Sequence, residues 1–214
     1  MKKLLLTLAL VVGMTASAQK TTDYYFFLDL TAPELIEPFK EQIFSKISFS
    51  GIGKDSDCNG IKVTIVPITD VPFVQPKTVV LSAGGDECVW YAAPHERKEL
   101  IQSFRSKLNK AIGHYEYGEG YANTRIHETV SGELSKIKPE TKVYILSDMI
   151  ENGFEFSMLN SYPKNVDGTY ESIKDLDVTL IQGVDSEIDI KFLDYALMFW
   201  TKVFPGSKYE RIQL

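Results

Sequence analysis

Basic residues are too few in this sequence for a nucleic-acid-binding protein. Its 214 residues include 23 Lys and Arg against 29 Asp and Glu, which gives a formal net charge of −6. No basic stretch interrupts that balance, and contacts to phosphate dominate the affinity of proteins for nucleic acids. We therefore expect no nucleic-acid partner, and the same charge disfavours binding to an anionic membrane surface.

Long hydrophobic runs are also missing, except at the N-terminus. Lys2 and Lys3 precede an apolar run over residues 4–14, and Ala16-Ser17-Ala18 is typical of a signal-peptide cleavage site. The run is shorter than the roughly 20 apolar residues that a membrane-spanning helix needs. The sequence thus predicts a signal peptide over residues 1–18, cleavage near Ala18, no membrane insertion, and an exported protein that is periplasmic or secreted.

Cysteine and histidine are scarce. The two cysteines, Cys58 and Cys88, lie in Gly- and Asp-rich sequence, and export favours a disulfide between them over free thiols or a metal pair. The three histidines are His95, His114 and His127, and no two have the i, i+4 spacing of a metal site. No Gly-x-Ser-x-Gly motif supplies a nucleophile, so a hydrolytic triad is not predicted.

What the sequence does contain is an alternation of strand-like and helix-like segments. Apolar or β-branched runs predict strands over residues 24–30, 61–68, 78–81, 143–147, 178–181 and 209–214. Apolar residues at helical spacing predict helices over residues 33–47, 94–112, 124–137 and 187–204. This order predicts one α/β domain over residues 19–214, with three layers and a mostly parallel central sheet that carries helices on both faces.

Polar side chains follow two of the predicted strands. Asp29 lies at the carboxyl end of the first strand and Thr31 directly follows it, Asp148 follows the fourth strand, and Thr124 opens a helix. Ligands of open parallel sheets bind at the carboxyl ends of the strands, so we expect these residues at one rim. Carboxylate and hydroxyl oxygens suit Mg²⁺, Mn²⁺ or Ca²⁺.

These motifs and the order of the elements resemble the von Willebrand factor type A (vWA) domain, a Rossmann-like fold. That family often carries a metal-ion-dependent adhesion site, built from Asp-x-Ser-x-Ser, a loop Thr and a later Asp. The resemblance implies Asp29, Thr31, Thr124 and Asp148 as metal ligands, whereas Pro33 stands at the second Ser position and offers no side-chain oxygen. Water can replace a missing ligand at a cost in affinity, so we expect a weakly bound Mg²⁺ or other divalent cation, or none.

The function implied by the resemblance is non-enzymatic. A vWA-like module would dock a protein or a surface ligand at the rim, where an acidic group of the partner completes the coordination shell of the ion. Loop aromatics could add to that surface or simply pack, namely Trp90, Tyr91, Tyr115, Tyr117 and Tyr121. Four residues of the last helix lie outside its main apolar stripe and could pack or form an interface, namely Phe192, Tyr195, Met198 and Phe199.

Three other interpretations of the rim stay open at the level of sequence. Thr31 and Glu34 have the spacing of a capping box, and Asn123 or Thr124 could cap the next helix. A structural periplasmic protein with a decayed site would keep the same residues. A haloacid-dehalogenase-like phosphohydrolase would use Asp29 as its nucleophile, although Thr31 stands where that family has its second acid.

Overall fold

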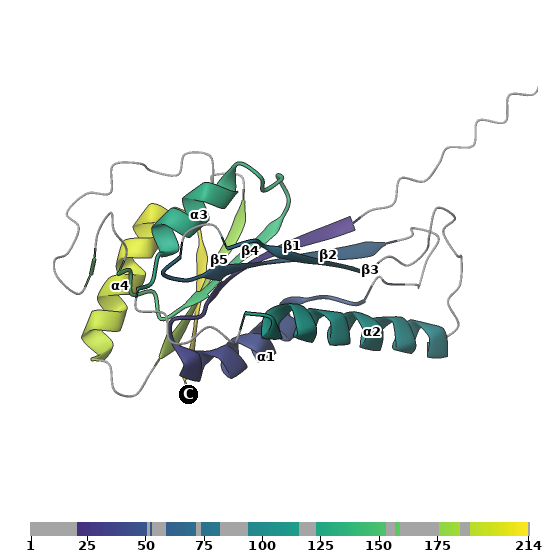
Figure 1. Ribbon diagram of the computed structural model, residues 1–214. Helices are drawn as coiled ribbons and strands as arrows, with labels where there is room; N and C mark the ends of the chain where they lie inside the picture. Colours follow the sequence, from purple (N-terminus) through teal and green to yellow (C-terminus); the bar gives the residue numbers. More distant parts are fainter. Residues whose placement is uncertain are drawn as a thin grey trace, which may run out of the picture.

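The computed structural model describes residues 21–50, 52, 59–71, 74–81, 94–115, 123–152, 157–158, 176–184 and 189–213. Its centre is a six-stranded sheet in the order β3-β2-β1-β4-β5-β6 (Figure 1). The parallel strands are β1 (Thr21–Asp29), β2 (Gly60–Ile68), β4 (Lys142–Ser147), β5 (Asp177–Val184) and β6 (Lys208–Gln213). The edge strand β3 (Lys77–Leu81) is antiparallel to β2, and the prediction of a mostly parallel sheet is confirmed.

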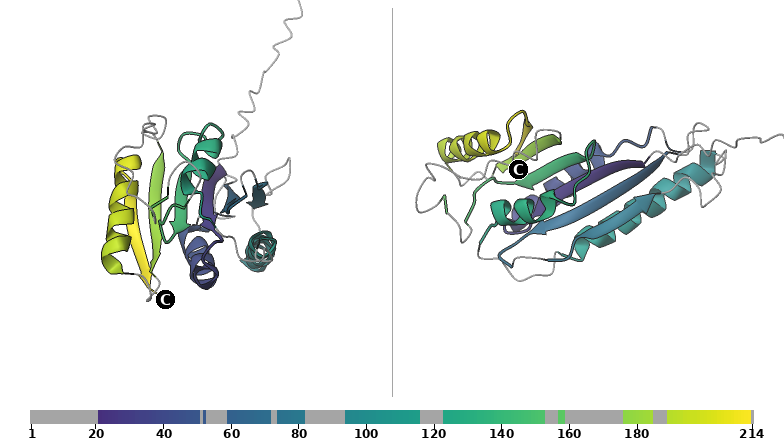
Figure 2. Two further views of the ribbon diagram at one scale, coloured as in Figure 1. Left: turned by 60° about the vertical axis from the view of Figure 1, so that its left-hand side comes forward. Right: turned by 90° about the horizontal axis from the view of Figure 1, so that it is seen from above.

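Helices cover both faces of the sheet. A 3₁₀ turn, η1 (Pro33–Leu35), leads into α1 (Ile36–Lys46), which shares one apolar cluster with α2 (Pro94–Gly113). The cluster on the opposite face is formed with α3 (Ile126–Leu134) and α4 (Ile190–Val203), as the views in Figure 2 show. The predicted three-layer α/β architecture is therefore confirmed.

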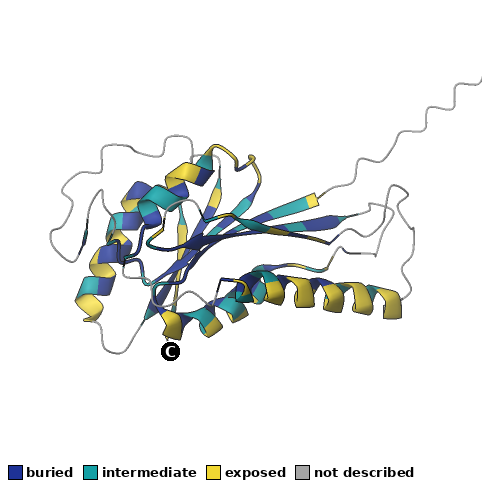
Figure 3. Cartoon of the chain, in the orientation of Figure 1, coloured by how far each residue is buried: buried dark blue, intermediate teal, exposed yellow. Residues whose placement is uncertain are grey.

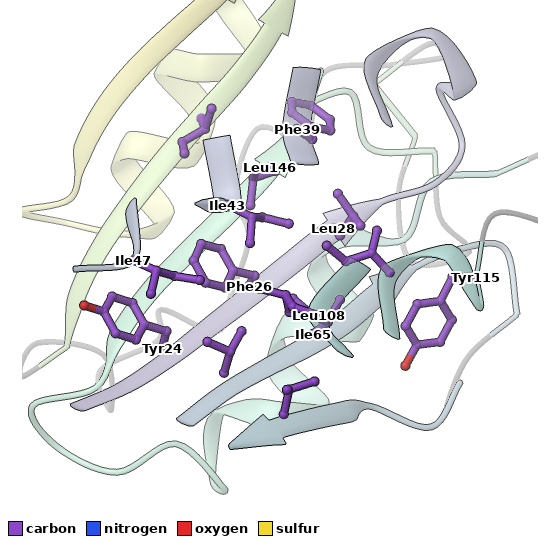
Figure 4. Packing of buried hydrophobic residues seen from close by; sticks show 14 of the residues in the cluster. Tyr24, Phe26, Leu28, Phe39, Ile43, Ile47, Ile65, Leu108, Tyr115 and Leu146 are labelled. Atoms are coloured by element: carbon purple, nitrogen blue, oxygen red, sulfur yellow. The ribbon is translucent and has the colours of Figure 1, made fainter. Parts of the chain in front are cut away.

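The central strand β1 supplies side chains to both clusters. Tyr24, Phe26 and Leu28 point toward α1 and α2, where Phe26 and Leu28 lie among Phe39 and Ile43 (Figure 4). Phe27 points to the other face and packs with α3 and α4. A strand that is covered on both faces reads as a continuous apolar run, which explains the composition of this segment. Figure 3 shows the resulting buried sheet beneath helices whose outer faces are exposed.

The fifth strand and the last helix are among the elements whose bounds differ from the predicted ranges. The fifth strand, predicted over residues 178–181, runs from Asp177 to Val184. A Cβ atom on Gly183 would lie 2.6 Å from Leu35 Cδ2. Glycine at this position therefore lets Leu35 of η1 pack against the sheet, and it does not mark the end of the strand. The last helix, predicted to begin at residue 187, begins at Ile190, because Asp189 is its N-cap and accepts a hydrogen bond from Lys191 N. Ile190 is 47 % exposed, whereas Ala196 and Val203 are buried.

Several predictions concern residues outside the described part of the chain. They are the signal peptide over residues 1–18, the disulfide between Cys58 and Cys88, and the loop aromatics Trp90, Tyr91, Tyr117 and Tyr121. Tyr115 is described, and it packs: its ring is buried and its hydroxyl donates to Gln75 O at 2.6 Å. Among the described residues, no helix combines the length and apolarity needed to cross a membrane.

Candidate functional site at the carboxyl ends of β1 and β4

The site is built around the buried carboxylate of Asp29, the last residue of β1. Its Oδ1 accepts hydrogen bonds from Thr31 N at 2.8 Å and from Thr31 Oγ1 at 2.6 Å. Its Oδ2 accepts from Ser147 Oγ at 2.5 Å, at the end of the neighbouring strand β4. Asp29 is fully buried, and these three donors hold its carboxylate in one orientation.

Thr124 joins this group from a segment 93 residues away. Its Oγ1 lies 2.6 Å from Thr31 Oγ1. Because Thr31 gives its single hydroxyl proton to Asp29, Thr124 is the donor in this contact. The backbone around Thr124 is tied to the loop after β4, where Asn152 N donates to Thr124 O at 2.8 Å and Asn152 Nδ2 donates to Asn123 Oδ1 at 3.1 Å.

Asp148 completes the group at the end of β4. Its Oδ1 accepts from Ile150 N at 2.8 Å and lies 3.3 Å from Ser147 Oγ. Its Oδ2 makes no hydrogen bond to any described residue, and the side chain is partly exposed. Asp148 therefore keeps one oxygen available at the rim, whereas Asp29 uses both of its oxygens internally.

The four residues predicted from the sequence, Asp29, Thr31, Thr124 and Asp148, thus belong to one hydrogen-bonded cluster together with Ser147. We call these five residues the rim cluster. Both capping interpretations are wrong. The N-cap residue of η1 is Ala32 and that of α3 is Arg125, and neither residue makes a side-chain cap hydrogen bond. The hydroxyls of Thr31 and Thr124 instead contact the Asp29 carboxylate and each other.

Reasoning from sequence missed three residues around the rim. Ser147 Oγ contacts the carboxylates of both Asp29 and Asp148. Its position directly before Asp148 is the sequence feature that could have identified it. Glu151 is buried and its Oε2 accepts from His127 N at 3.0 Å, so it caps α3 from 24 residues away. Gln182 is also buried and pairs with Ser147 in the register of β4 and β5. No local sequence pattern indicates the roles of Glu151 and Gln182.

Burial makes the acids of this region hard to ionise. It raises the pKa of Asp29, against the lowering effect of the hydrogen bonds from Ser147 and Thr31. It raises the pKa of Asp148 to about 7, to which the charge of Asp29 adds. It raises the pKa of Glu151 to about 8, although backbone hydrogen bonds from His127 and Ile126 favour the charged form. A cation bound at this rim would favour the ionised forms and so lower these pKa values.

The oxygen set fits a small divalent cation that keeps much of its water. Adjacent ligands of octahedral Mg²⁺ lie about 2.9 Å apart, given metal–oxygen distances of about 2.0–2.1 Å. The hydroxyl oxygens of Thr31 and Thr124, 2.6 Å apart, would separate by a few tenths of an ångström to hold one ion. Within the described residues, no three His, Cys, Asp or Glu side chains are grouped to bind a metal ion. Hydroxyls and water would therefore supply most of the ligands.

The other candidate side chains make no hydrogen bond to the rim cluster within the described residues. His95 is near the start of α2 and His114 follows its last residue, and both side chains are exposed. His127 meets the rim through its backbone amide. Tyr195 and Met198 of α4 are each 55 % exposed.

Comparisons with known proteins identify no family for this chain. No protein-family model matches the chain, and no curated protein matches it. Sixteen chains of solved structures match. One is the human COPII-coat protein Sec24c, with 11 % sequence identity and a TM-score of 0.49 over 91 % of this chain and 30 % of that chain. This chain therefore spans less than a third of that protein, and the likeness carries no argument about function. The fold class rests on the chain's own strand order, which is consistent with a vWA-like or Rossmann-like three-layer architecture.

Proposed function

We propose that this chain is a non-enzymatic binding module that docks a protein or surface ligand at the rim cluster through a weakly held divalent cation. One observation carries the proposal. The hydroxyls of Thr31 and Thr124 meet at 2.6 Å across 93 residues of sequence, and neither caps a helix. Because neither hydroxyl is used in capping, the two oxygens and the neighbouring carboxylate form a set of hard oxygen donors of the kind that Mg²⁺ and Ca²⁺ bind.

Each residue has a distinct task in this proposal. Asp29 anchors Thr31 from below the surface of the rim by accepting a hydrogen bond from its hydroxyl group. Thr31 and Thr124 present hydroxyl oxygens as direct ligands. Asp148 offers its free Oδ2 to the ion or to one of its waters. A bound cation would have a coordination position that the chain leaves open, and an acidic group of the partner can fill it.

The burial of Asp29 supports this proposal over phosphoryl transfer. A nucleophilic carboxylate must reach the substrate phosphorus, whereas Asp29 is fully buried and both of its oxygens accept hydrogen bonds from the protein. The phosphohydrolase alternative would need this carboxylate to leave its three donors. Turnover of a generic phosphate ester that disappears in Asp29→Asn would favour the enzyme.

The test is cation affinity measured by calorimetry with Mn²⁺ and Mg²⁺ at millimolar concentrations. Thr31→Val and Thr124→Val each remove one hydroxyl at nearly constant volume, and each should weaken binding at least tenfold. Thr64→Val is the matched control, because Thr64 is also buried and its Oγ1 lies 3.2 Å from Thr78 Oγ1, four residues before the end of β2. If all three variants bind the cation as tightly as the wild type, or if the wild type binds no cation, a structural protein with a decayed site is the better description.

A further inference from the structure

The chain turns sharply directly after Asp148. Met149 has φ 68°, a left-handed conformation that non-glycine residues adopt at a cost of about 1 kcal/mol or more. This turn brings Met149 N to Ser147 Oγ at 2.9 Å and Ile150 N to Asp148 Oδ1 at 2.8 Å. The turn therefore sets which oxygen of Asp148 is used internally and which stays free.

Two side chains from other elements hold the backbone carbonyls of this turn. Gln182 Nε2 on β5 donates to Asp148 O at 3.2 Å, and Trp200 Nε1 on α4 donates to Met149 O at 2.9 Å. Gln182, Trp200 and Met149 are all fully buried. Because these residues are buried, the two donors satisfy carbonyls inside the protein and stabilise the strained turn.

The carboxamide of Gln182 is fixed on both sides. Its Nε2 also donates to Leu193 O of α4 at 2.8 Å, and its Oε1 accepts from Arg211 Nε of β6 at 3.0 Å. Arg211 is held in turn by Asp194, whose Oδ1 accepts from Nη2 at 2.7 Å. Because an arginine is only a donor, Oε1 must face it, and both amide protons then face the carbonyls of Asp148 and Leu193.

A purely structural need at this position would be met by an aliphatic residue, like Leu180 and Ile181 beside it in β5. An aliphatic side chain would fill the space, but it would leave the carbonyls of Asp148 and Leu193 without the donors that Gln182 supplies, which is destabilising for each buried group. What an apolar residue cannot do is orient the carbonyl of Asp148.

We propose that Gln182, together with Trp200, is a positioning residue of the rim: it holds the Asp148–Met149 turn so that Asp148 keeps Oδ2 free for a ligand. This inference rests on the proposed function for the role of Asp148. The orientation itself is a property of the metal-free protein and can be measured there.

The experiment compares the wild type with Gln182→Met, which keeps the length of the side chain and removes both donors. Trp200→Phe removes the second donor and keeps an aromatic ring. Ile181→Val is the control for a general loss of packing in the same strand. The readouts are Mn²⁺ affinity and, without metal, the hydrogen-exchange rate of the Ile150 amide relative to amides in β1.

Gln182→Met and Trp200→Phe should weaken Mn²⁺ binding at least fivefold and speed Ile150 exchange at least tenfold relative to β1. Ile181→Val should change neither the Mn²⁺ affinity nor the exchange rate of the Ile150 amide relative to β1. If both donor variants keep the Mn²⁺ affinity and the Ile150 exchange rate of the wild type, the positioning role is wrong, whatever the stability of the variants. If the wild type binds no Mn²⁺, the proposed function fails, and the Ile150 exchange rate alone then decides whether Gln182 positions Asp148.

Discussion

The buried acids of the rim predict a protein that loses stability as pH rises. Asp148 and Glu151 have ordinary pKa values of 3.8 and 4.5, and in the folded chain these rise to about 7 and about 8. Between the two values of each group, the folded state binds more protons than the unfolded state, so the free energy of unfolding falls with increasing pH. The stabilisation is complete below about pH 4 and is lost as pH passes through 7 and 8.

The magnitude follows from the pKa changes. Each unit corresponds to about 1.4 kcal/mol, so full ionisation of Asp148 costs at most roughly 4 kcal/mol and that of Glu151 at most roughly 5 kcal/mol. Urea unfolding at pH 5, 6, 7 and 8 without divalent cations measures the effect. We expect the free energy of unfolding to fall by several kcal/mol from pH 5 to pH 8.

Neutral variants identify the groups responsible. Asp148→Asn and Glu151→Gln keep an acceptor oxygen for Ile150 N and His127 N, and each should flatten part of the pH profile. Asp177→Asn, at an exposed acid on β5, is the control for removal of one charge and should leave the slope unchanged. A flat wild-type profile between pH 5 and pH 8, or one that rises, would refute the reasoning from buried acids.

Three further predictions concern the rim and its support. Ser147→Ala removes the donor to Asp29 Oδ2 and should lower the free energy of unfolding by about 1–3 kcal/mol, whereas Ser131→Ala on the exposed face of α3 should be nearly neutral by urea unfolding. Gly183→Ala places a methyl group 2.6 Å from Leu35 and should cost about 1–3 kcal/mol, whereas Gly132→Ala has open space in α3 and should stabilise by up to about 1 kcal/mol. Under the proposed function, 10 mM Mg²⁺ should raise the thermal midpoint more at pH 8 than at pH 6, because protons compete with the cation at Asp148; an equal rise at both pH values would count against it.

The sequence was sufficient to place the predicted ligands at one rim because that inference needs only buried strands and their order. The apolar run before Asp29 and the one before Asp148 identify adjacent parallel strands, and parallel strands bring their carboxyl ends together. The hydrogen bonds themselves depend on side-chain geometry. Thr31 and Thr124 have the spacing of helix caps, and only the approach of two loops distant in sequence directs their hydroxyls to each other.

The supporting residues could not be predicted because their partners are remote in sequence. Glu151 caps a helix that begins 25 residues earlier, and Gln182 reaches Asp148 across 34 residues. Gly183 lies beyond the predicted end of the fifth strand, and its lack of a side chain makes room for the packing of Leu35. A long-range contact of this kind leaves no periodic signal in the chain.

The most direct measurement is an anomalous difference map from a crystal of this protein soaked in millimolar Mn²⁺. The account predicts a peak about 2.2 Å from both Thr31 Oγ1 and Thr124 Oγ1, with Asp148 reached directly or through one water. An unaltered hydroxyl contact between these two threonines, with no peak at the rim, would contradict the central claim that the cluster at the ends of β1 and β4 holds a divalent cation.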